Sequence, residues 1–323
     1  MSKALVIGGN GFIGSHLVDT LANLGWEVTV FDLNNRQYDT APRRVNFIQG
    51  DTNNLNSGME NIIEETAPDV IFHLAWNSIN ETSLQNPTMD LVTNVTPAIS
   101  IIHACTKFSR KLIFLSSGGA VYGLSNQKRI PETHPLNPIS PYGIGKLAVE
   151  KYLEMYHYLH GLNYAVVRPS VPYGPRQDYL KRQGAVAVFL YRVSQGLPLT
   201  IWGDGNNIRD FFYVTDLIDA IIKCADHDLQ KNRIFNVGGS EGITLNQLIA
   251  EVETITGMKA IIDLQPARQF DPPQIMLDTT LLRSELGWAP QISLTEGMRK
   301  TWNWISKISA KSIERSDKKT QGV

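Results

Sequence analysis

The sequence predicts an α/β protein, in which a doubly wound parallel sheet is followed by a smaller C-terminal α/β lobe. Short apolar runs alternate with amphipathic helical patterns through the first half of the chain, as in βαβ units whose sheet is covered on both faces. A glycine-rich turn joins the first apolar run to the first helical pattern. After Arg168, prolines and glycines break the alternation, so a second lobe is expected to begin there.

The expected strands are short runs dominated by Val, Ile, Leu and Phe. Before the break they are Ala4–Ile7, Val28–Phe31, Val45–Ile48, Val70–Leu74, Leu112–Leu115 and Tyr164–Val167. A later run, Ile234–Val237, is expected to return to the sheet, so the two lobes interleave. We assign residues 1–168 and about 212–239 to the first lobe, 169–211 and 240–308 to the second, and 309–323 to a flexible polar tail.

The composition excludes several classes of function. Thirty Lys and Arg residues balance thirty-one Asp and Glu residues, which leaves no electrostatic footprint for nucleic acid or an anionic membrane. The apolar start is too short for a signal sequence or a membrane span. Cys105 and Cys224 fall in helical patterns and provide neither a disulfide framework nor a zinc site. We therefore expect a cytoplasmic protein without a metal.

The turn Gly8-Gly-Asn-Gly-Phe-Ile-Gly14 lies between the first strand and a helical pattern that runs from Ser15 to Leu24. Glycines there let the backbone approach a pyrophosphate, whose charge is stabilised by the free N–H groups at the start of the helix. The motif alone is weak evidence, but its position makes an ordinary glycine-rich turn the poorer explanation. We therefore predict a Rossmann-type, dinucleotide-binding domain.

An acidic residue favours NAD as the dinucleotide. Asp32 ends the second strand eighteen residues after Gly14, where a carboxylate accepts hydrogen bonds from both ribose hydroxyls and repels a 2′-phosphate. Arg36 nearby keeps NADP as an alternative. Asp51 follows the third strand, where it is expected either to lie at the adenine end of the cofactor or to cap a turn.

Tyr142 and Lys146 form a candidate catalytic pair. They stand four residues apart at the head of a helical pattern, so both side chains project from one face. A neighbouring ammonium favours phenolate and is expected to lower the tyrosine pKa from about 10, which would make Tyr142 a general acid and base. An exposed Tyr/Lys pair is the commoner meaning of this spacing, but here a dinucleotide motif precedes it.

Further motifs follow these in order and cover nearly the whole chain. They are His73-Leu-Ala75, Ser116-Ser-Gly-Gly-Ala-Val-Tyr-Gly123, Arg168-Pro, Gly203-Asp-Gly205 leading to Arg209-Asp-Phe and Asp216, and Arg268-Gln-Phe-Asp271-Pro. With the glycine-rich turn, Asp32 and the Tyr/Lys pair, they resemble the extended short-chain dehydrogenase/reductase family. The subgroup they resemble is that of the UDP-glucose 4-epimerase-like, NAD-dependent epimerases and dehydratases.

The resemblance implies roles for particular residues. Tyr142 and Lys146 would be catalytic, with Ser117 beside them. Arg209 and Arg268 would bind the diphosphate, in keeping with the match between a guanidinium and phosphate oxygens, and Asp271 would bind the nucleoside ribose. The residues expected at the cofactor are Gly8, Gly11, Phe12, Ile13, Gly14, Asp32, Asp51, Leu74, Ala75, Asn94, Tyr142 and Lys146. Asn94 is equally explained as a buried polar plug.

The chain departs from the family pattern at three positions. Gly118 stands where relatives carry the Ser or Thr that hydrogen-bonds the substrate and the tyrosine, and Ala120 cannot replace it. Either Ser117, water or the substrate supplies that hydrogen bond, or turnover is impaired. Val171 stands where relatives often carry a substrate-binding Asn; Ser170 and Arg176 are the candidates to compensate.

The favoured reaction is 4-epimerisation of a UDP-hexose or UDP-N-acetylhexosamine through a 4-keto sugar, an isomerase step of polysaccharide biosynthesis. A 4,6-dehydratase carries acids where this chain has Gly119-Ala120, and would have to recruit Glu81 or Glu132. A 4-keto reductase would prefer a phosphorylated cofactor, which Asp32 disfavours. A catalytically silent NAD- or sugar-nucleotide-binding protein is the alternative from another class.

Two further expectations concern the surroundings of the pair. Trp76 is expected either to wall the sugar pocket or to pack in the core. The helical patterns Asp90–Thr106 and Tyr142–His160 carry apolar stripes, which burial within one chain explains as well as pairing with a second subunit does. By resemblance these two helices form a four-helix bundle in a homodimer.

Overall fold

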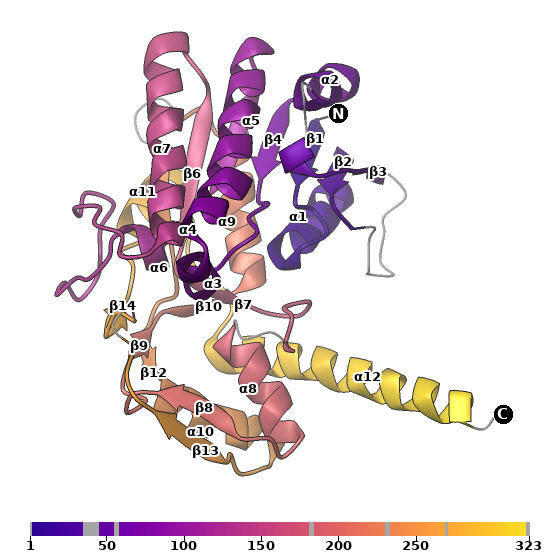
Figure 1. Cartoon of the computed structure of the whole chain (residues 1–323), viewed down its shortest axis with the longest axis vertical. Coiled ribbons are helices and arrows are strands. Elements are labelled where there is room, and N and C mark those ends of the chain that lie inside the picture. Colours follow the sequence, from indigo (N-terminus) through magenta and orange to yellow (C-terminus); the bar gives the residue numbers. More distant parts are fainter. Residues whose placement is uncertain are drawn as a thin grey trace.

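A seven-stranded, wholly parallel sheet forms the centre of the computed structural model, which describes residues 2–34, 45–54, 58–180, 184–229, 233–268 and 271–320, with side chains to residue 308 (Figure 1). Its strand order is β11-β6-β5-β4-β1-β2-β3. The strands are β1 (Lys3–Ile7), β2 (Glu27–Asp32), β3 (Val45–Gln49), β4 (Val70–His73), β5 (Lys111–Leu115), β6 (Tyr164–Pro169) and β11 (Ile234–Val237). The predicted strands and fold class are confirmed, including the return of β11 to β6. Arg36 lies outside the described residues.

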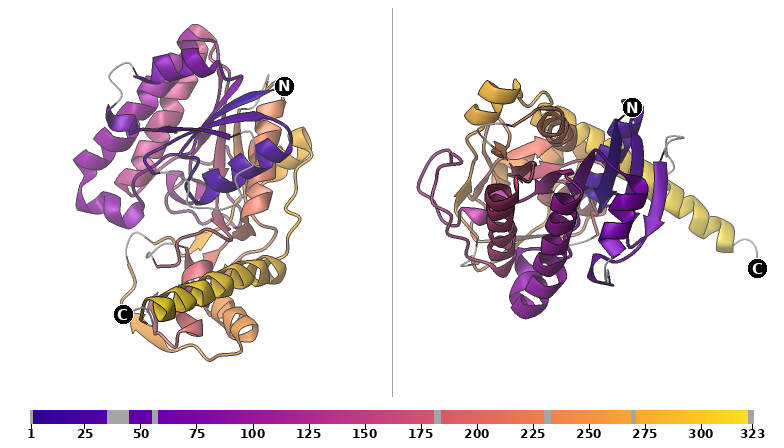
Figure 2. Two further views of the ribbon diagram at one scale, coloured as in Figure 1. Left: turned by 90° about the vertical axis from the view of Figure 1, so that its right-hand side faces the viewer. Right: turned by 90° about the horizontal axis from the view of Figure 1, so that it is seen from above.

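Helices cover both faces of this sheet (Figure 2). One hydrophobic core joins the sheet to α1, α9 and α11, and the other joins it to α2, α5 and α7. Each side of the sheet is therefore buried, which explains why the strands are apolar on both faces. The bounds are α1 (Phe12–Asn23), α2 (Gly58–Thr66), α5 (Thr96–Lys107), α7 (Pro141–His160), α9 (Val214–Asp226) and α11 (Thr280–Leu286).

Short elements lie between the strands and the long helices of the first lobe. Between β3 and α2 lies the 3-10 helix η1 (Thr52–Asn54); between β4 and α5 lie α3 (Asn80–Gln85), α4 (Pro87–Asp90) and the π-helical turn η2 (Leu91–Val95); and α6 (Gly118–Val121) follows β5. The predicted helix Asp90–Thr106 thus begins as a π turn. There the Thr96 N–H donates to the Leu91 carbonyl, and Pro97, which has no N–H, follows at once.

The second lobe is built from three small sheets and three helices around its own core. Its strands are β7 (Val171–Tyr173), β8 (Leu199–Trp202), β9 (Ile208–Arg209), β10 (Phe211–Tyr213), β12 (Ile243–Thr244), β13 (Ile262–Gln265) and β14 (Gln274–Ile275). Its helices are α8 (Ala185–Ser194), α10 (Leu245–Thr256) and α12 (Leu294–Thr320). Since α9 and β11 lie between these segments in sequence and belong to the first lobe, the chain passes between the lobes several times.

The last helix, α12, packs on the second lobe through Met298, Trp302 and Ile305, and its backbone runs on to Thr320 (Figure 1). The polar tail predicted for 309–323 thus has a helical backbone over most of its length, and its flexibility stays a prediction. Among the residues described, no helix combines the length and apolar character needed to cross a membrane.

Candidate active site

A cavity of about 340 Å³ opens at the carboxyl ends of β1, β2 and β4. It is lined by the glycine-rich turn, by the ends of these strands and by the loop after β4: Ile7, Gly8, Asn10, Gly11, Phe31, Asp32, Leu33, Asn34, Gly50, Thr52, Leu74, Ala75, Trp76 and Asn77. In a doubly wound sheet this edge is where ligands bind. Gly11 caps α1 without a side-chain hydrogen bond, so the first N–H groups of α1 have no side-chain cap.

The glycines of this turn are required by close backbone contacts. A Cβ on Gly14 would lie 2.1 Å from the Gly8 carbonyl oxygen, and one on Gly8 would lie 2.7 Å from the Ala75 nitrogen. Gly8 also has a φ of 85°, which side chains rarely tolerate. The bare backbone between α1 and the loop after β4 therefore fits the pyrophosphate of a dinucleotide, which needs N–H donors at close range.

The two predicted acidic cofactor residues differ in placement. Asp32 lines the cavity, and its carboxylate accepts the N–H of Asn10 at 2.9 Å and that of Asn34 at 3.2 Å. Asp51 is a turn cap: its Oδ1 accepts the N–H of Asn53 at 2.9 Å at the start of η1. Of the two roles expected for Asp51, the turn cap is the one observed, while its neighbours Gly50 and Thr52 line the cavity.

The helix that carries the catalytic pair begins at a well-defined cap. The Ser140 hydroxyl accepts the N–H of Gly143 at 3.1 Å, and Pro141 occupies the first turn, where a missing N–H costs nothing. Helix α3 docks against this cap, since Ser140 Oγ donates to Asn80 Oδ1 at 2.7 Å and the Tyr142 N–H donates to Ser83 Oγ at 3.2 Å. The start of α7 is thereby fixed in place.

Ser117 is the hydroxyl that interacts with the candidate catalytic tyrosine, Tyr142. This interaction lowers the pKa of the phenol and so favours phenolate. Removal of the phenol from water acts more strongly, with Asp90 adding to it, and the pKa of Tyr142 is raised rather than lowered. The expected lowering by Lys146 is therefore wrong for this state of the protein.

Lys146 is turned toward aromatic rings. Its ammonium lies 3.8 Å from the centre of the Trp76 ring and 4.9 Å from that of Phe114, and it donates to the Leu115 carbonyl at 2.7 Å. Only 3% of the residue is exposed, and burial lowers the pKa of Lys146 to about 7, against the opposing effect of Glu150 and Asp90. At neutral pH this lysine can therefore change its charge.

Trp76 thus belongs to both the cavity and the catalytic pair. It lines the cavity, meets the Tyr142 ring edge-on with centres 6.0 Å apart, and donates its indole N–H to Ser78 Oγ at 3.1 Å. A Cβ on Gly145 would lie 3.1 Å from the indole, so a glycine on α7 makes room for it. Trp76 therefore lines the cavity and also packs against the hydrophobic core beside α5 and α7, and its role at a sugar stays a prediction.

Asn94 holds the loop that carries Trp76. Its Oδ1 accepts the N–H of Asn77 at 2.7 Å, and its amide donates to the Asp90 carbonyl and carboxylate at 3.0 and 3.1 Å. The residue is 4% exposed and lies in the π turn. The buried polar plug is therefore the role observed, and its effect is to position the cavity wall.

The space beside Gly118 explains why no serine stands there. A Cβ at this position would lie 2.4 Å from Leu277 Cδ1 and 3.1 Å from the Arg168 carbonyl. Leu277 is fully buried and fills the space that a larger residue would need. Ser117, one residue back, is the hydroxyl that interacts with Tyr142.

The three residues expected at the substrate diphosphate and ribose lie together. Arg268 Nε donates to Asp271 Oδ2 at 2.9 Å, and the charges of Arg268 and Asp271 both influence the pKa of Arg209. The Arg268 guanidinium also lies 4.8 Å from the centre of the Trp202 ring and 3.7 Å from Glu81 of α3. Since α3 also docks on α7, one short helix connects this cluster to the catalytic pair.

The two residues proposed to compensate for Val171 have other partners. Arg176 Nη2 lies 2.6 Å from Asp19 of α1, and the backbone of Arg176 has a φ of 69°. The Ser170 hydroxyl donates to the Asp210 carbonyl at 2.7 Å. Val171 itself packs against the core of the second lobe. A substrate role for Arg176 stays a prediction.

The sequence reasoning missed a buried ion pair behind the catalytic pair. Glu150 of α7 and Arg168 of β6 are both about 2% exposed and joined by a salt bridge of 2.5 Å, and Ser116 donates to the same carboxylate. The available signal was spacing: Glu150 stands one further turn along α7 from Lys146, on a face that had to be buried.

Comparisons with known proteins show the family of this chain and its similarity to solved epimerase structures. Residues 4–238 match the model of the NAD dependent epimerase/dehydratase family. A putative UDP-glucose 4-epimerase of Methanocaldococcus jannaschii is 34% identical over 93% of this chain and 97% of its own length. The UDP-glucose 4-epimerase of Thermotoga maritima with UDP-glucose superimposes with a TM-score of 0.89 at 36% identity, over 95% of this chain and 99% of that one. The enzyme of Thermus thermophilus in complex with NAD gives 0.87 at 34% identity, over 94% and 98%.

Proposed function

The chain belongs to the NAD dependent epimerase/dehydratase family, and we propose that it is an NAD-dependent nucleotide-sugar epimerase that inverts C4 of a UDP-hexose or UDP-N-acetylhexosamine. One observation carries the proposal: Tyr142 and Lys146 both contact Trp76, which lines the cavity proposed for the dinucleotide. A proton-transfer group would thus lie next to the cofactor, as alcohol oxidation requires. The UDP-glucose 4-epimerase relatives support the choice of reaction.

The residues present fit NAD. Backbone N–H groups between Gly8 and Gly14 would hold the pyrophosphate, and Asp32 would accept both hydroxyls of the adenine ribose. Lys146 would hold the nicotinamide ribose. When bound, NAD would take a hydride from C4 of the sugar and return it to the opposite face. An Asp32→Ala variant is expected to bind NAD about tenfold to a hundredfold more weakly, because charged hydrogen bonds are lost.

Tyr142 would move the proton in both halves of the cycle. Its phenolate accepts the proton of the 4-hydroxyl while the C4–H bond breaks, and the phenol returns that proton to the 4-keto oxygen when the C–H bond re-forms. Ser117 would donate to the phenolate and Lys146 would stabilise it by charge. Because the pKa of Tyr142 is raised in this structure, Lys146 must turn from Trp76 toward Tyr142 to favour phenolate.

The cluster of Arg209, Arg268 and Asp271 would bind the nucleotide. Two guanidinium groups supply the charge and the forked donors that a diphosphate needs. An anion bound there would offset both the repulsion between the two guanidinium groups and the cost of removing Arg209 from water. UDP is proposed as that nucleotide because the named relatives act on UDP-sugars.

The alternatives receive less support. The acids named for a dehydratase are engaged elsewhere: Glu81 faces Arg268 at 3.7 Å, and Glu132 accepts the N–H of Asn236 at 2.8 Å. Asp32 at the cavity disfavours the phosphorylated cofactor of a 4-keto reductase. The contact of Ser117 with Tyr142 replaces the function lost at Gly118, which weakens the case for a silent binder.

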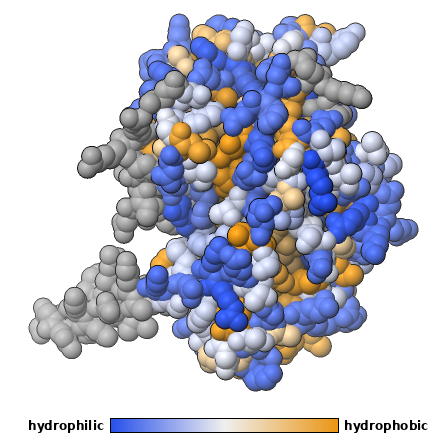
Figure 3. Space-filling model, turned by 180° about the vertical axis from the view of Figure 1, so that it is seen from behind, coloured by the Kyte–Doolittle hydropathy of each residue, from blue (hydrophilic) through white to orange (hydrophobic). Residues whose placement is uncertain are grey.

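We also propose a homodimer formed by α5 and α7. The exposed hydrophobic residues on and before these helices are Met89, Leu91, Val92, Ile144, Tyr152, Met155, Tyr158 and Leu159. On the opposite face, seen in Figure 3, hydrophobic patches are interrupted by hydrophilic side chains. These residues lie on α7 and on the turns of α4 and η2 that lead into α5, and exposed apolar side chains gathered on neighbouring helices are typical of a subunit interface. A role in polysaccharide biosynthesis and a cytoplasmic location, where two free buried cysteines stay reduced, complete the proposal.

The test is to incubate the purified protein with UDP-, dTDP- and GDP-hexoses without added cofactor and to identify the products by NMR. A C4 epimer, lost in Tyr142→Phe, is the expected result and would also show that bound NAD is recycled. A 4-keto-6-deoxy product would show that the protein is a dehydratase and not an epimerase. NAD binding without conversion of any sugar would favour the silent binder.

A further inference from the structure

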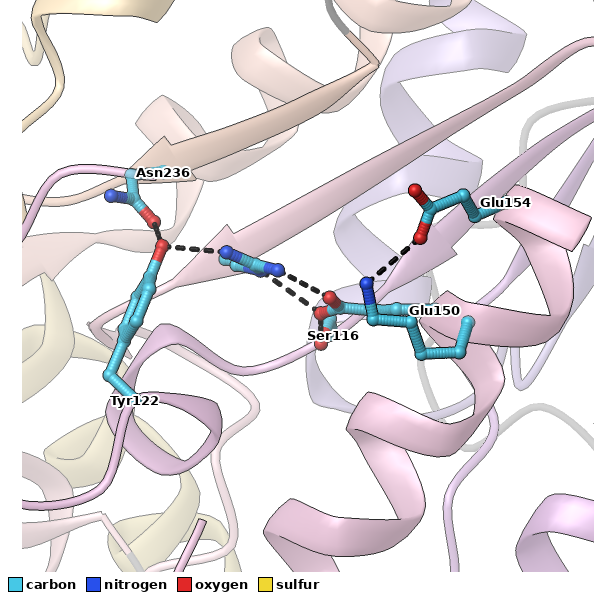
Figure 4. Close-up of polar contacts among 7 residues, drawn as sticks. Ser116, Tyr122, Glu150, Glu154 and Asn236 are labelled. Carbon is cyan, nitrogen blue, oxygen red and sulfur yellow. Dashed lines mark hydrogen bonds and ion pairs between the residues drawn. The ribbon is translucent and has the colours of Figure 1, made fainter. Parts of the chain in front are cut away.

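A buried polar network lies behind the catalytic pair, between α7, β5 and β6 (Figure 4). Glu150 Oε1 accepts from Ser116 Oγ at 2.5 Å and from Arg168 Nε at 3.0 Å, and Oε2 accepts from Arg168 Nη2 at 2.5 Å. At its other end Arg168 Nη1 donates to the Tyr122 hydroxyl at 2.8 Å, which donates to Asn236 at 2.7 Å. The charges of Glu150 and Arg168 are thus paired with each other and hydrogen-bonded inside the core.

Such a pair needs a reason other than stability. Two charges taken out of water often stabilise a fold no better than apolar residues of the same volume would. The strands around it are otherwise apolar, and Glu150 lies next to Val149 and one turn from Leu153, both fully buried. A role in positioning accounts for the retention of a charged group at this point.

The segment Leu115–Ser117 connects the network to both catalytic groups. The Leu115 carbonyl accepts a hydrogen bond from the Lys146 ammonium, the Ser116 hydroxyl donates to Glu150, and Ser117 interacts with Tyr142 and lowers the pKa of its phenol. Three successive residues thus contact three residues spaced by one turn along α7. Ser116 is also fixed through its N–H, which donates to the Val167 carbonyl at 2.8 Å.

We propose that Glu150, held by Arg168, is a positioning residue that clamps the Leu115–Ser117 segment to α7 and thereby aims Ser117 at Tyr142 and fixes the charge beside Lys146. The inference rests on the proposed roles of Tyr142 and Lys146. Glu150 touches neither the cavity lining nor the substrate cluster, so its effect is exerted through these side chains.

Several groups face Lys146, and the charge of Glu150 acts among them. On α7 they are Glu150 and Tyr142, on α4 Asp90, and on β4 His73, whose pKa is lowered by burial and by Lys146. Trp76 and Phe114 carry no charge and contact the ammonium with the faces of their rings. Glu150 and Asp90 raise the pKa of Lys146, so loss of either charge makes the lysine neutral at a lower pH.

Three variants separate positioning from bulk stability. Glu150→Gln removes the charge and leaves Arg168 unpaired. Ser116→Ala removes the clamp and keeps the ion pair. Tyr122→Phe is the control, because it removes the two buried hydrogen bonds of the Tyr122 hydroxyl, to Arg168 and Asn236, on the far side of Arg168. All three lose a buried polar contact, and only the first two affect the contact with the Leu115–Ser117 segment.

Two kinetic quantities are measured for the epimerisation: the pH profile of kcat, and KM. The ionisation of the Tyr142 phenol is followed separately by ultraviolet difference absorbance, with Tyr142→Phe as the reference. In Glu150→Gln we expect the alkaline limb of kcat to move down by about one pH unit, with KM nearly unchanged. In both Glu150→Gln and Ser116→Ala we expect the phenolate to titrate at higher pH, while Tyr122→Phe keeps the wild-type values.

Equal shifts in Tyr122→Phe would overturn the proposal, as would wild-type titration in Ser116→Ala. If Glu150→Gln does not fold, Ser116→Ala still decides, because its ion pair is intact. If the wild-type protein converts no sugar, the proposed function fails on its own, and the phenolate titration still tests the clamp.

Discussion

The ammonium of Lys146 lies 3.8 Å from the centre of the Trp76 ring and 5.8 Å from that of Tyr142. The indole is therefore the closer π-system to this charge, and it also lines the cavity. A cation held against a tryptophan away from water gains about 2 kcal/mol. Trp76 thus stabilises the charged form of Lys146 at the point where burial opposes it.

A Trp76→Leu variant should consequently lose activity at a lower pH than the wild type does. Removal of about 2 kcal/mol lowers the lysine pKa by roughly 1.5 units, from a value already near 7. The measurement is the alkaline limb of kcat. Trp202→Leu is the control, since this indole stacks on Arg268 and its loss should raise KM without moving the limb. Identical profiles for Trp76→Leu and the wild type would contradict the role assigned to the indole.

The buried charge of Lys146 should lower the free energy of unfolding at neutral and acidic pH. Its pKa in the folded chain is about 7, against 10.5 for an ordinary lysine, so between these values the unfolded chain binds more protons and the free energy of unfolding rises with pH. Below pH 7 the full cost of burying the charge is present. A Lys146→Met variant should therefore be more stable than the wild type below pH 7, with the difference shrinking toward pH 10.5. Urea unfolding at several pH values measures it; a constant difference would count against the assignment.

Restoring the family serine at Gly118 should damage the fold instead of improving catalysis. The new Cβ would lie 2.4 Å from Leu277, and overpacking of this kind costs about 1–3 kcal/mol. The midpoint of urea unfolding of Gly118→Ser reports this cost. In a Leu277→Ala background, the same Gly118→Ser substitution should cost less than it does in the wild type, because the clash is removed. A stable and faster Gly118→Ser enzyme would show that Ser117 does not fill the role.

The sheet and the shared helix face of Tyr142 and Lys146 could be predicted because both depend on local patterns. Apolar runs and a glycine-rich turn determine the strands and the start of α1, and a spacing of four places Tyr142 and Lys146 on one face of α7. The grouping of Arg209 with Arg268 and Asp271 could be placed only through the resemblance. Its members come from segments about sixty residues apart, which no local pattern joins.

What could not be predicted depends on contacts between distant segments. The raised pKa of Tyr142 follows from burial, which a sequence spacing does not report. Gly118 reads as a defect until Leu277 is seen to fill the adjacent space. The ion pair of Arg176 with Asp19 of α1 joins two segments that no local pattern connects. In each case the partner lies more than a hundred residues away or the cause is solvent exclusion.

Dimerisation through α7 can be tested with two equally exposed methionines. Met155 lies on α7 and is 41% exposed, whereas Met258 follows α10 in the second lobe and is 42% exposed. A two-fold interface would bring both copies of Met155 into it, so Met155→Glu places two charges in an apolar contact and should weaken the dimer by about a hundredfold or more.

Sedimentation velocity over a range of concentrations gives the dissociation constant of each variant. Met258→Glu introduces the same charge at the same exposure and should leave the dimer intact. Because α7 also carries Tyr142 and Lys146, loss of the partner should loosen the C-terminal turns of this helix first, and the catalytic turn at Ser140 is held independently by α3. A monomeric Met155→Glu should therefore keep most of its kcat, whereas a monomeric wild type would rule out subunit pairing as the reason for the exposed apolar face of α7.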